Sequence, residues 1–237
     1  MKRLFLIMCL AMVAVVLPGI AAPIDCPTTG TVATLVGLNP TGCFINGLLF
    51  DNFTFTPSAT GTGLLPTQAQ VSYTLDNPGT STGTGQLIYG FEFNPNLSVV
   101  GLGSEDILLG YTIVAPSLEI SSLHVLETAL VSGTGSTATV SEGPDCGKTT
   151  IGGGCTFLPT ITVTPTSPHQ DLLGIGPYIE IDVLKDINVT STNEGGLAGI
   201  SGVRDSVDLT GTTPEPATCA IVGAGLIGLA MLRRKKA

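Results

Sequence analysis

Apolar and polar residues alternate in short runs along most of this chain, and this period of two constrains the fold more than any other feature. The pattern is clearest in five segments: 71–75, 87–93, 160–164, 179–183 and 207–209. Alternation of this kind predicts strands with one buried face and one exposed face. Threonine and glycine are abundant, as in strands joined by tight turns, and no segment between residues 22 and 213 has a convincing helical period.

Turn signals separate these runs. Asn46-Gly47 joins 43–45 to 48–50 and predicts a two-residue hairpin, and Asp76-Asn77-Pro78-Gly79 is expected to open a loop that runs to Gly85. The chain from residue 22 to 213 is therefore predicted to be one all-β domain of ten or more short strands. We expect a single antiparallel β-sandwich, with a jelly roll as one form of it and a barrel as the runner-up.

The charge of this middle region excludes one class of function. Between Ala22 and Thr213 the only cations are Lys148, Lys185 and Arg204, so the region carries a net charge of about −14. Binding to nucleic acid needs clustered lysine and arginine, and we therefore expect no nucleic-acid partner. Most of the carboxylates are expected to be solvated surface charges.

Calcium is the weaker interpretation of the same acidity. The densest group of oxygen ligands comprises Asp182, Asp186, Asn188 and Glu194. No EF-hand or repeated Asp/Gly pattern accompanies them, so no metal site and no cofactor is predicted, and these four remain weak calcium candidates.

Four cysteines belong to the middle region: Cys26, Cys43, Cys146 and Cys155. In an oxidising compartment they suggest two disulfides with three possible pairings, of which Cys26 with Cys43 and Cys146 with Cys155 close the shortest loops. A zinc site is the competing interpretation, but the spacing lacks the paired separations of structural zinc ligands.

No catalytic constellation is evident. The only histidines are His124, expected as a solvent-facing strand residue, and His169, expected in a loop, and neither has a recognisable triad context. We therefore predict no catalytic residues and no enzymatic activity, with a glycan hydrolase as the remaining enzymatic alternative.

The N-terminus has the three parts of a secretory signal peptide. Met1-Lys2-Arg3 is basic, 4–17 is apolar, and 18–21 is a breaker followed by small residues. Residues 1–21 are therefore predicted to direct export through the Sec machinery and to be removed.

The C-terminus, 214–237, combines a proline motif, an uncharged stretch at 217–232 and a basic end. The motif is Pro214, Glu215 and Pro216, and the basic tail is Arg233, Arg234, Lys235 and Lys236. The uncharged stretch predicts a transmembrane helix, and the cations place its end in the cytoplasm.

These three features in this order resemble the PEP-CTERM sorting signal of exported proteins in Gram-negative bacteria that make exopolysaccharide. The resemblance covers only residues 214–237. It implies recognition by an exosortase, an integral-membrane cysteine enzyme, which would process the chain near Pro214-Glu215-Pro216. It also implies transient anchoring in the inner membrane and then a place at the outer surface or in the extracellular matrix, where exopolysaccharide is a further partner.

Two functions other than a non-enzymatic surface or matrix protein remain open. A carbohydrate-binding or adhesive module would suit a β-sandwich, but the chain has no tryptophan and only Tyr73, Tyr89, Tyr111 and Tyr178 as phenols. A matrix-polymer hydrolase using two carboxylates is the less favoured alternative.

Overall fold

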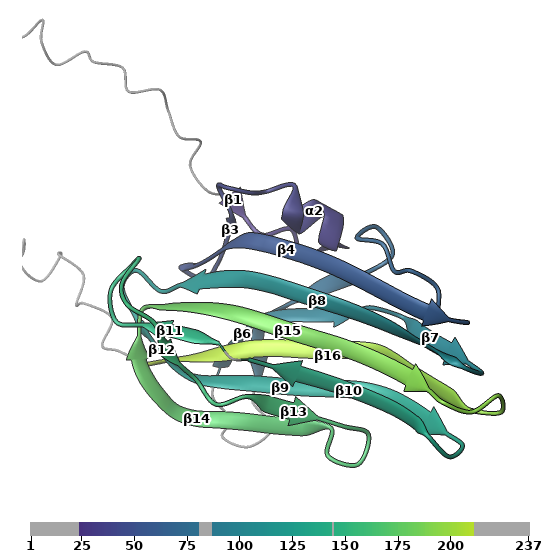
Figure 1. The fold of residues 1–237 in the computed structure, drawn as a ribbon. Coiled ribbons are helices and arrows are strands. Elements are labelled where there is room, and N and C mark those ends of the chain that lie inside the picture. The colour runs from purple at the N-terminus through teal and green to yellow at the C-terminus, as the bar shows by residue number, and fades with distance from the viewer. Residues whose placement is uncertain (1–23, 81–86, 144, 211–237) are drawn as a thin grey trace, which may run out of the picture.

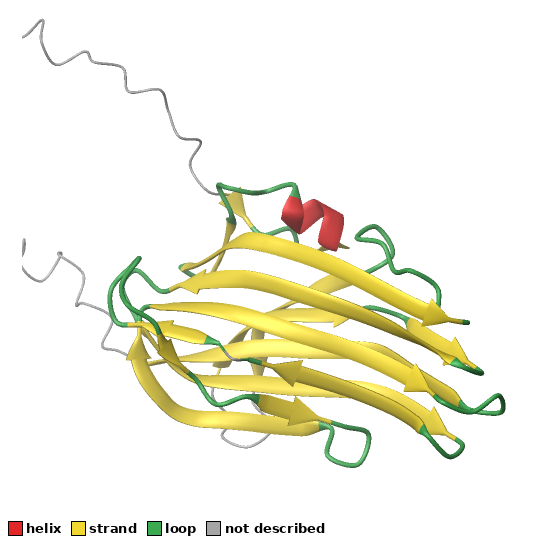
Figure 2. Cartoon of the chain, viewed as in Figure 1, coloured by secondary structure: helices red, strands yellow, loops and turns green. Residues whose placement is uncertain are grey.

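The computed structural model describes residues 24–80, 87–143 and 145–210, and within them two β-sheets pack face to face. Figure 1 shows the two layers with their long strands running nearly along one direction, and Figure 2 shows that strands make up most of the described chain, with loops between them. The expected β-sandwich is therefore confirmed.

The first layer is a nine-stranded sheet that contains strands from both halves of the chain. Its strand order is β1 (Ile24–Asp25), β3 (Cys43–Ile45), β4 (Leu48–Gly61), β8 (Gly103–Val114), β15 (Glu180–Ser191), β10 (Ser136–Glu142) and β13 (Ile161–Val163), with β11 (Cys146–Lys148) beside β15 and β12 (Thr156–Phe157) beside β11. Strands β8 and β15 pair over twelve residues and form the centre of this sheet.

The second layer is a seven-stranded sheet. Its strand order is β14 (His169–Tyr178), β9 (Glu119–Ser132), β16 (Leu197–Thr210), β6 (Leu87–Asn94), β5 (Ser72–Thr80) and β2 (Thr29–Thr31), with β7 (Leu97–Val100) also beside β16. The single helix of the described residues, α2 (Val32–Val36), is one short turn that buries Val32 and Leu35.

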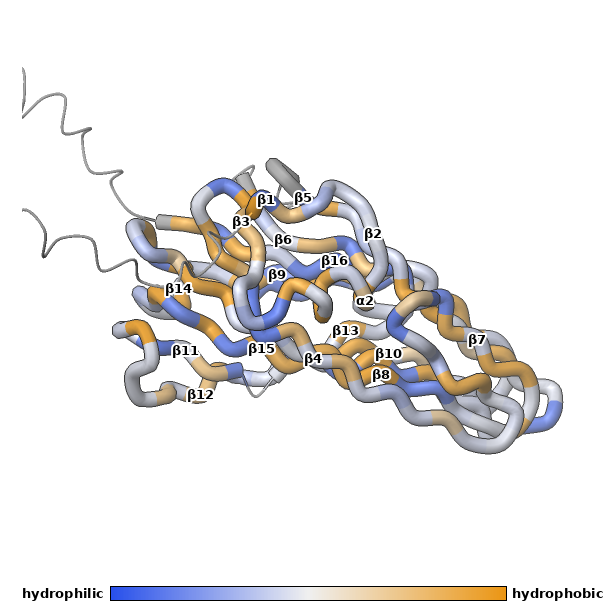
Figure 3. The backbone as a smooth tube through the Cα atoms, turned by 90° about the horizontal axis from the view of Figure 1, so that it is seen from above, coloured by the Kyte–Doolittle hydropathy of each residue, from blue (hydrophilic) through white to orange (hydrophobic). Residues whose placement is uncertain are grey.

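The core lies between the sheets and is built by the alternation that the sequence shows. Orange apolar and blue polar stretches alternate along the strands in Figure 3. In β15 the inward row contains Ile181, Val183, Ile187 and Val189, all buried. Successive side chains of a strand point to opposite faces, so one row faces the other sheet.

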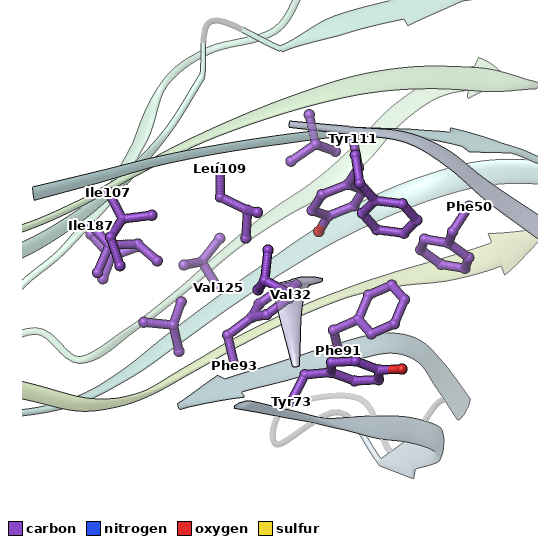
Figure 4. Packing of buried hydrophobic residues seen from close by; sticks show 14 of the residues in the cluster. Val32, Phe50, Tyr73, Phe91, Phe93, Ile107, Leu109, Tyr111, Val125 and Ile187 are labelled. Carbon is purple, nitrogen blue, oxygen red and sulfur yellow. The ribbon is translucent and has the colours of Figure 1, made fainter. Parts of the chain in front are cut away.

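Aromatic rings form one end of this core (Figure 4). Phe91 of β6 packs edge-on against Phe50 at 5.0 Å, Tyr73 at 5.5 Å and Phe53 at 5.9 Å between ring centroids. Pairs of this kind add about 0.5–1.5 kcal/mol beyond the area that they bury.

Two local predictions are confirmed. Cys43 pairs with Phe50 across the predicted hairpin, and Asn46 and Gly47 have φ of 48° and 86°, as a type I′ turn requires. Cys26–Cys43 and Cys146–Cys155 are the disulfides of the described residues, so the pairing with the shortest loops forms.

Other details of the fold differ from the prediction. The strands are not all short, since β4, β9 and β16 each have 14 residues. The first part of the loop predicted over 76–85 is strand instead, because β5 continues to Thr80 through a register shift between Asp76 and Gly79. The rest of that predicted loop, 81–85, lies outside the described residues. Pro78 lies at that irregularity, where a strand tolerates proline. The sheet is also not wholly antiparallel, because β1 pairs with β3 in parallel.

The two predicted ends fall outside this description. The signal peptide, 1–21, and the C-terminal sorting segment, 214–237, lie beyond the described residues. Among the helices that are described, none has the length and apolar character needed to cross a membrane.

Candidate functional site

A lysine lies in the middle of the core. Lys185 occupies the inward row of β15 between Val183 and Ile187, and its side chain is 0% exposed. The same periodicity that directs the neighbouring apolar residues inward also directs this cation inward. Its partners must therefore come from other inward rows.

Those partners are carboxylates from both sheets. Lys185 Nζ donates to Glu142 Oε2 on the neighbouring strand β10, and it lies 3.3 Å from Asp205 Oδ2 on β16 of the opposite sheet. The Tyr111 hydroxyl of β8 donates to the same Asp205 oxygen. The core cluster, defined as Lys185, Glu142, Asp205 and Tyr111, therefore connects the two layers.

A further carboxylate lies beside the core cluster. Asp145 is buried and its Oδ1 accepts a hydrogen bond of 2.9 Å from the backbone N–H of Leu184. One cation thus faces three buried carboxyl groups. Among the described residues, Glu142 Oε1 and Asp205 Oδ1 have no hydrogen-bond partner.

Burial and mutual repulsion shift the titration of these groups. Burial, followed by the charge of Asp205, raises the pKa of Glu142 well above its ordinary value, and burial raises the pKa of Asp145 to about 6. Burial and the charge of Asp205 raise the pKa of Tyr111. Burial by itself lowers the pKa of Lys185, but the charges of Asp205 and Glu142 outweigh it and the net shift is upward. Burial thus favours the protonated, uncharged form of Glu142 and Asp145, while the neighbouring carboxyl groups favour the charged form of Lys185.

A second polar cluster lies on the other side of the seven-stranded sheet. His124 of β9 is directly opposite Asp171 of β14 in the antiparallel register, and His169 lies two residues before Asp171 on the same strand. His124 Nδ1 and His169 Nε2 are 2.6 Å and 2.7 Å from Asp171 Oδ1. On its far side, His124 Nε2 is 3.1 Å from Oδ2 of the buried Asp208.

This histidine cluster has the donors of a transition-metal site. One ligand atom each from His124, His169 and Asp171 lies within 4.8 Å of the other two, and this is the one such group of three among the described residues. Imidazole nitrogen with a carboxylate oxygen suits zinc and related divalent ions.

The interpretation of His124 from sequence is wrong. The residue is only 4% exposed rather than solvent-facing. His169 is the first residue of β14 rather than a loop residue. The spacing of two between His169 and Asp171 was the available signal, since residues two apart on a strand share a face. His124 lies 45 positions before His169, and its place beside them could not be read from the local sequence.

The four calcium candidates do not gather into one site. Asp182 forms an ion pair of 2.5 Å with Lys148, and Asn188 Oδ1 accepts a hydrogen bond from the Thr190 hydroxyl. Asp186 is an exposed residue beside Asp106. Partial burial of its carboxyl group, followed by the hydrogen bond and the charge of Asp106, raises its pKa to about 6. Glu194 is exposed beyond the end of β15.

The expectation that most carboxylates are solvated surface charges is also wrong for many of them. The buried acidic residues are Asp76, Glu105, Glu127, Glu142, Asp145, Glu180, Asp205 and Asp208. The reason is that several occupy inward rows of strands, where local composition gives no measure of solvent contact.

Comparison with known families concerns the end of the chain. Residues 212–235 match the PEP-CTERM protein-sorting motif. The C-terminal segment is a PEP-CTERM sorting signal. This confirms the resemblance drawn from Pro214-Glu215-Pro216 and the residues after it, and it marks an exported protein that is held at a membrane before processing. The match covers the signal and not the β-sandwich. A search of curated proteins gave no match.

Solved structures give distant likenesses to the described fold. The enzymatically active domain of tailspike protein 4 from bacteriophage CBA120 is 17% identical, with 66% of this chain and 19% of that chain covered and a TM-score of 0.31. The module TmCBM61, solved with β-1,4-galactotriose, is 11% identical, with 67% and 88% covered and a TM-score of 0.32. A family 11 carbohydrate-binding module from Clostridium thermocellum is 12% identical, with 67% and 88% covered and a TM-score of 0.23. The matched part spans about a fifth of the first of these solved chains. None of these scores is high enough to indicate what the present chain binds.

Proposed function

We propose that this chain is an exported bacterial protein of the outer surface or the exopolysaccharide matrix, without enzymatic activity towards other molecules. The observation that carries the proposal is the sorting motif at 212–235, which begins directly after β16 ends at Thr210. A folded domain followed at once by a sorting signal is the arrangement of a cargo that is exported through Sec, held in the inner membrane and released by an exosortase.

The disulfides of the domain support a location outside the cytoplasm. Two disulfides join cysteines of the described residues, and disulfides persist in oxidising compartments outside the cytoplasm. The placement of the core carboxylates weighs against a hydrolase that would use them. Glu142 and Asp205 are at most 1% exposed, so a polymer substrate has no access to them.

The carbohydrate-binding alternative is weakened by the position of the aromatic rings. Tyr73, Tyr89 and Tyr111 are buried and Tyr178 is partly buried. Phe157, 72% exposed, is the one strongly exposed aromatic side chain among the described residues. Sugar recognition by stacking would need exposed rings.

The test of the proposed function is the intact mass of the full chain recovered from the membrane, the outer surface and the medium of its source. We expect the surface and medium forms to lack residues 1–21 and the segment beyond Pro214-Glu215-Pro216. Replacing Pro214, Glu215 and Pro216 together with alanine should leave the chain in the membrane fraction. Recovery of an intact C-terminus in every fraction of the wild type would overturn the proposal in favour of a permanent tail anchor.

A second candidate function is binding of a divalent transition-metal ion by the histidine cluster, and the three convergent ligand atoms carry it. Titration of the full chain with Zn²⁺ should show one site. The ion should stabilise the folded state by about 2.7 kcal/mol at a hundredfold excess over Kd. Asp171→Asn and His169→Gln should abolish both effects, while Asp186→Asn, which alters an exposed carboxyl elsewhere, should retain them. Equal binding by the Asp171→Asn variant would exclude this site.

A further inference from the structure

The core cluster brings an amine and a carboxyl into reacting distance inside the protein. Lys185 Nζ lies 3.3 Å from Asp205 Oδ2, and Glu142 accepts a hydrogen bond from the same nitrogen. The three side chains are at most 1% exposed and come from three different strands. Oriented groups react most readily when the reacting atoms approach to about 3–3.5 Å. Here the attacked carbon, Asp205 Cγ, is bonded directly to the oxygen that lies 3.3 Å from Nζ.

We propose that Lys185 and Asp205 condense to an intramolecular amide bond, with Glu142 as the group that carries the protons. The inference does not depend on the proposed export or on the histidine cluster, because it concerns only residues between the two sheets.

The reaction balances without any other reagent. Glu142, whose protonated form burial favours, gives its proton to one oxygen of Asp205 and then takes a proton from the Lys185 ammonium, and the freed lone pair forms a bond to Asp205 Cγ. The protons lost by the nitrogen pass through Glu142 to one carboxyl oxygen, which leaves as water when its C–O bond breaks. An ammonium and a carboxylate thus become an amide and one water, and Glu142 ends in the protonation state in which it began.

The surroundings favour condensation over a persistent ion pair. Val183 and Ile187 flank Lys185 in its row, and Val203 and Val207 flank Asp205 in the opposite sheet, all of them buried. Charges in such a place have lost the favourable free energy of hydration, and their mutual attraction compensates for that loss only in part. Condensation removes one positive and one negative charge from this apolar layer and releases a water molecule to the solvent.

The hydrogen bonds also assign the two oxygens of Asp205. The Tyr111 hydroxyl donates to Oδ2, which becomes the amide oxygen and keeps that donor. Oδ1 has no hydrogen-bond partner among the described residues, and it is the oxygen that leaves. Glu142 then remains beside the amide N–H, for which its carboxyl oxygen is an acceptor. The product would join β15 to β16 and hence one sheet covalently to the other.

The decisive experiment is peptide mass spectrometry of the full chain after denaturation, reduction and digestion with trypsin. We expect no cleavage after Lys185, and a species that contains both Lys185 and Asp205 and is lighter by one water than the unlinked sequence. Fragmentation should place the link between those two side chains. Full cleavage after Lys185, with both peptides at their unmodified masses, would overturn the proposal.

Variants identify the chemistry. Asp205→Asn should still form the link but lose one ammonia in place of one water, because the amide nitrogen is then the leaving group. Glu142→Gln should lose most of the link, since the glutamine side chain cannot carry the protons. Glu127→Gln is the matched control, a change of a buried carboxyl in β9, and it should retain the full loss of water. If a variant does not fold, the digest of the wild-type chain still decides, and the result at 185 and 205 is independent of any processing at the C-terminus.

Discussion

Two lysines on or beside β15 have the same kind of partners and opposite surroundings. Lys148 pairs with Glu180 at 2.6 Å and Asp182 at 2.5 Å on the outer face of the nine-stranded sheet, and its side chain is 15% exposed. Lys185 pairs with Glu142 and Asp205 on the inner face and is 0% exposed. Three positions along one strand separate Asp182 from Lys185, and this is enough to change the face.

The difference shows that the contribution of an ion pair to stability is decided by its burial and not by the number of its partners. The hydrogen bonds that the Lys148 ammonium donates to Asp182 and Glu180 raise its pKa, and nearby solvent limits the resulting gain in stability. For Lys185, the loss of hydration is the largest single influence and must be compensated by several carboxyl groups at once. The outer ion pairs lie on one face of one sheet and contribute little to stability. The inner cluster connects residues of both sheets, so the stability of their packing depends on it.

The largest effect is expected when the inner cation is removed. Lys185→Met removes the cation of the buried pair, and with it the nitrogen of the proposed amide, and leaves Glu142 and Asp205 as buried free carboxyl groups. We expect the free energy of unfolding to fall by at least about 3–5 kcal/mol in chemical denaturation. Replacing Lys185, Glu142 and Asp205 together with apolar residues should recover part of this loss, because no uncompensated charge then remains. A loss below about 1 kcal/mol for Lys185→Met would mean that the cluster is no more important than a surface pair.

An intermediate effect on the free energy of unfolding, dependent on pH, is expected when Glu127 is replaced. Its carboxyl group is buried without a lysine partner in the described part of the chain. Burial raises the pKa of Glu127 from 4.5 to about 7, and no hydrogen bond to its carboxyl oxygens is found among the described residues. Between these two values the folded state holds a proton that the unfolded state has released, so stability falls as pH rises. Glu127→Gln abolishes this dependence, and we expect the variant to gain about 1–3 kcal/mol relative to wild type between pH 4 and pH 8.

Denaturation of both proteins at several pH values measures this gain. Glu119→Gln serves as the control, because Glu119 is an exposed carboxyl at the start of the same strand. This variant should keep the pH dependence of the wild type. Parallel stability profiles for wild type and Glu127→Gln would show that Glu127 is ionised in the folded protein at neutral pH.

The smallest effect is expected at the outer lysine. Lys148→Met should lower the free energy of unfolding by about 1 kcal/mol or less, because its pairs remain in contact with solvent. Added salt should shrink the difference further, since it screens exposed charges. A loss equal to that of Lys185→Met would remove the distinction between the two faces of β15.

Several features followed from local sequence. Alternation located the strands around 71–75, 87–93 and 179–183, and Asn46-Gly47 predicted its hairpin, because side-chain period and turn conformation are properties of neighbouring residues. The disulfide pairing and the sorting motif were found for the same reason, since short loops and contiguous motifs need no knowledge of the fold. The continuation of β5 past Pro78 was missed because pairing with β6 overrides a local turn signal.

The amino-acid sequence alone thus determined that the chain builds two-faced strands and ends in a sorting signal, and it favoured the two short disulfide loops among three possible pairings. It also held a sign of the inner cluster, because Lys185, Asp205 and Glu142 each occupy an apolar row of their strand. Only the tertiary structure decided that these three rows meet, and that His124 lies opposite Asp171. The physical reason is that strand period is local, whereas the order of strands and the stacking of sheets depend on contacts between residues far apart in the chain.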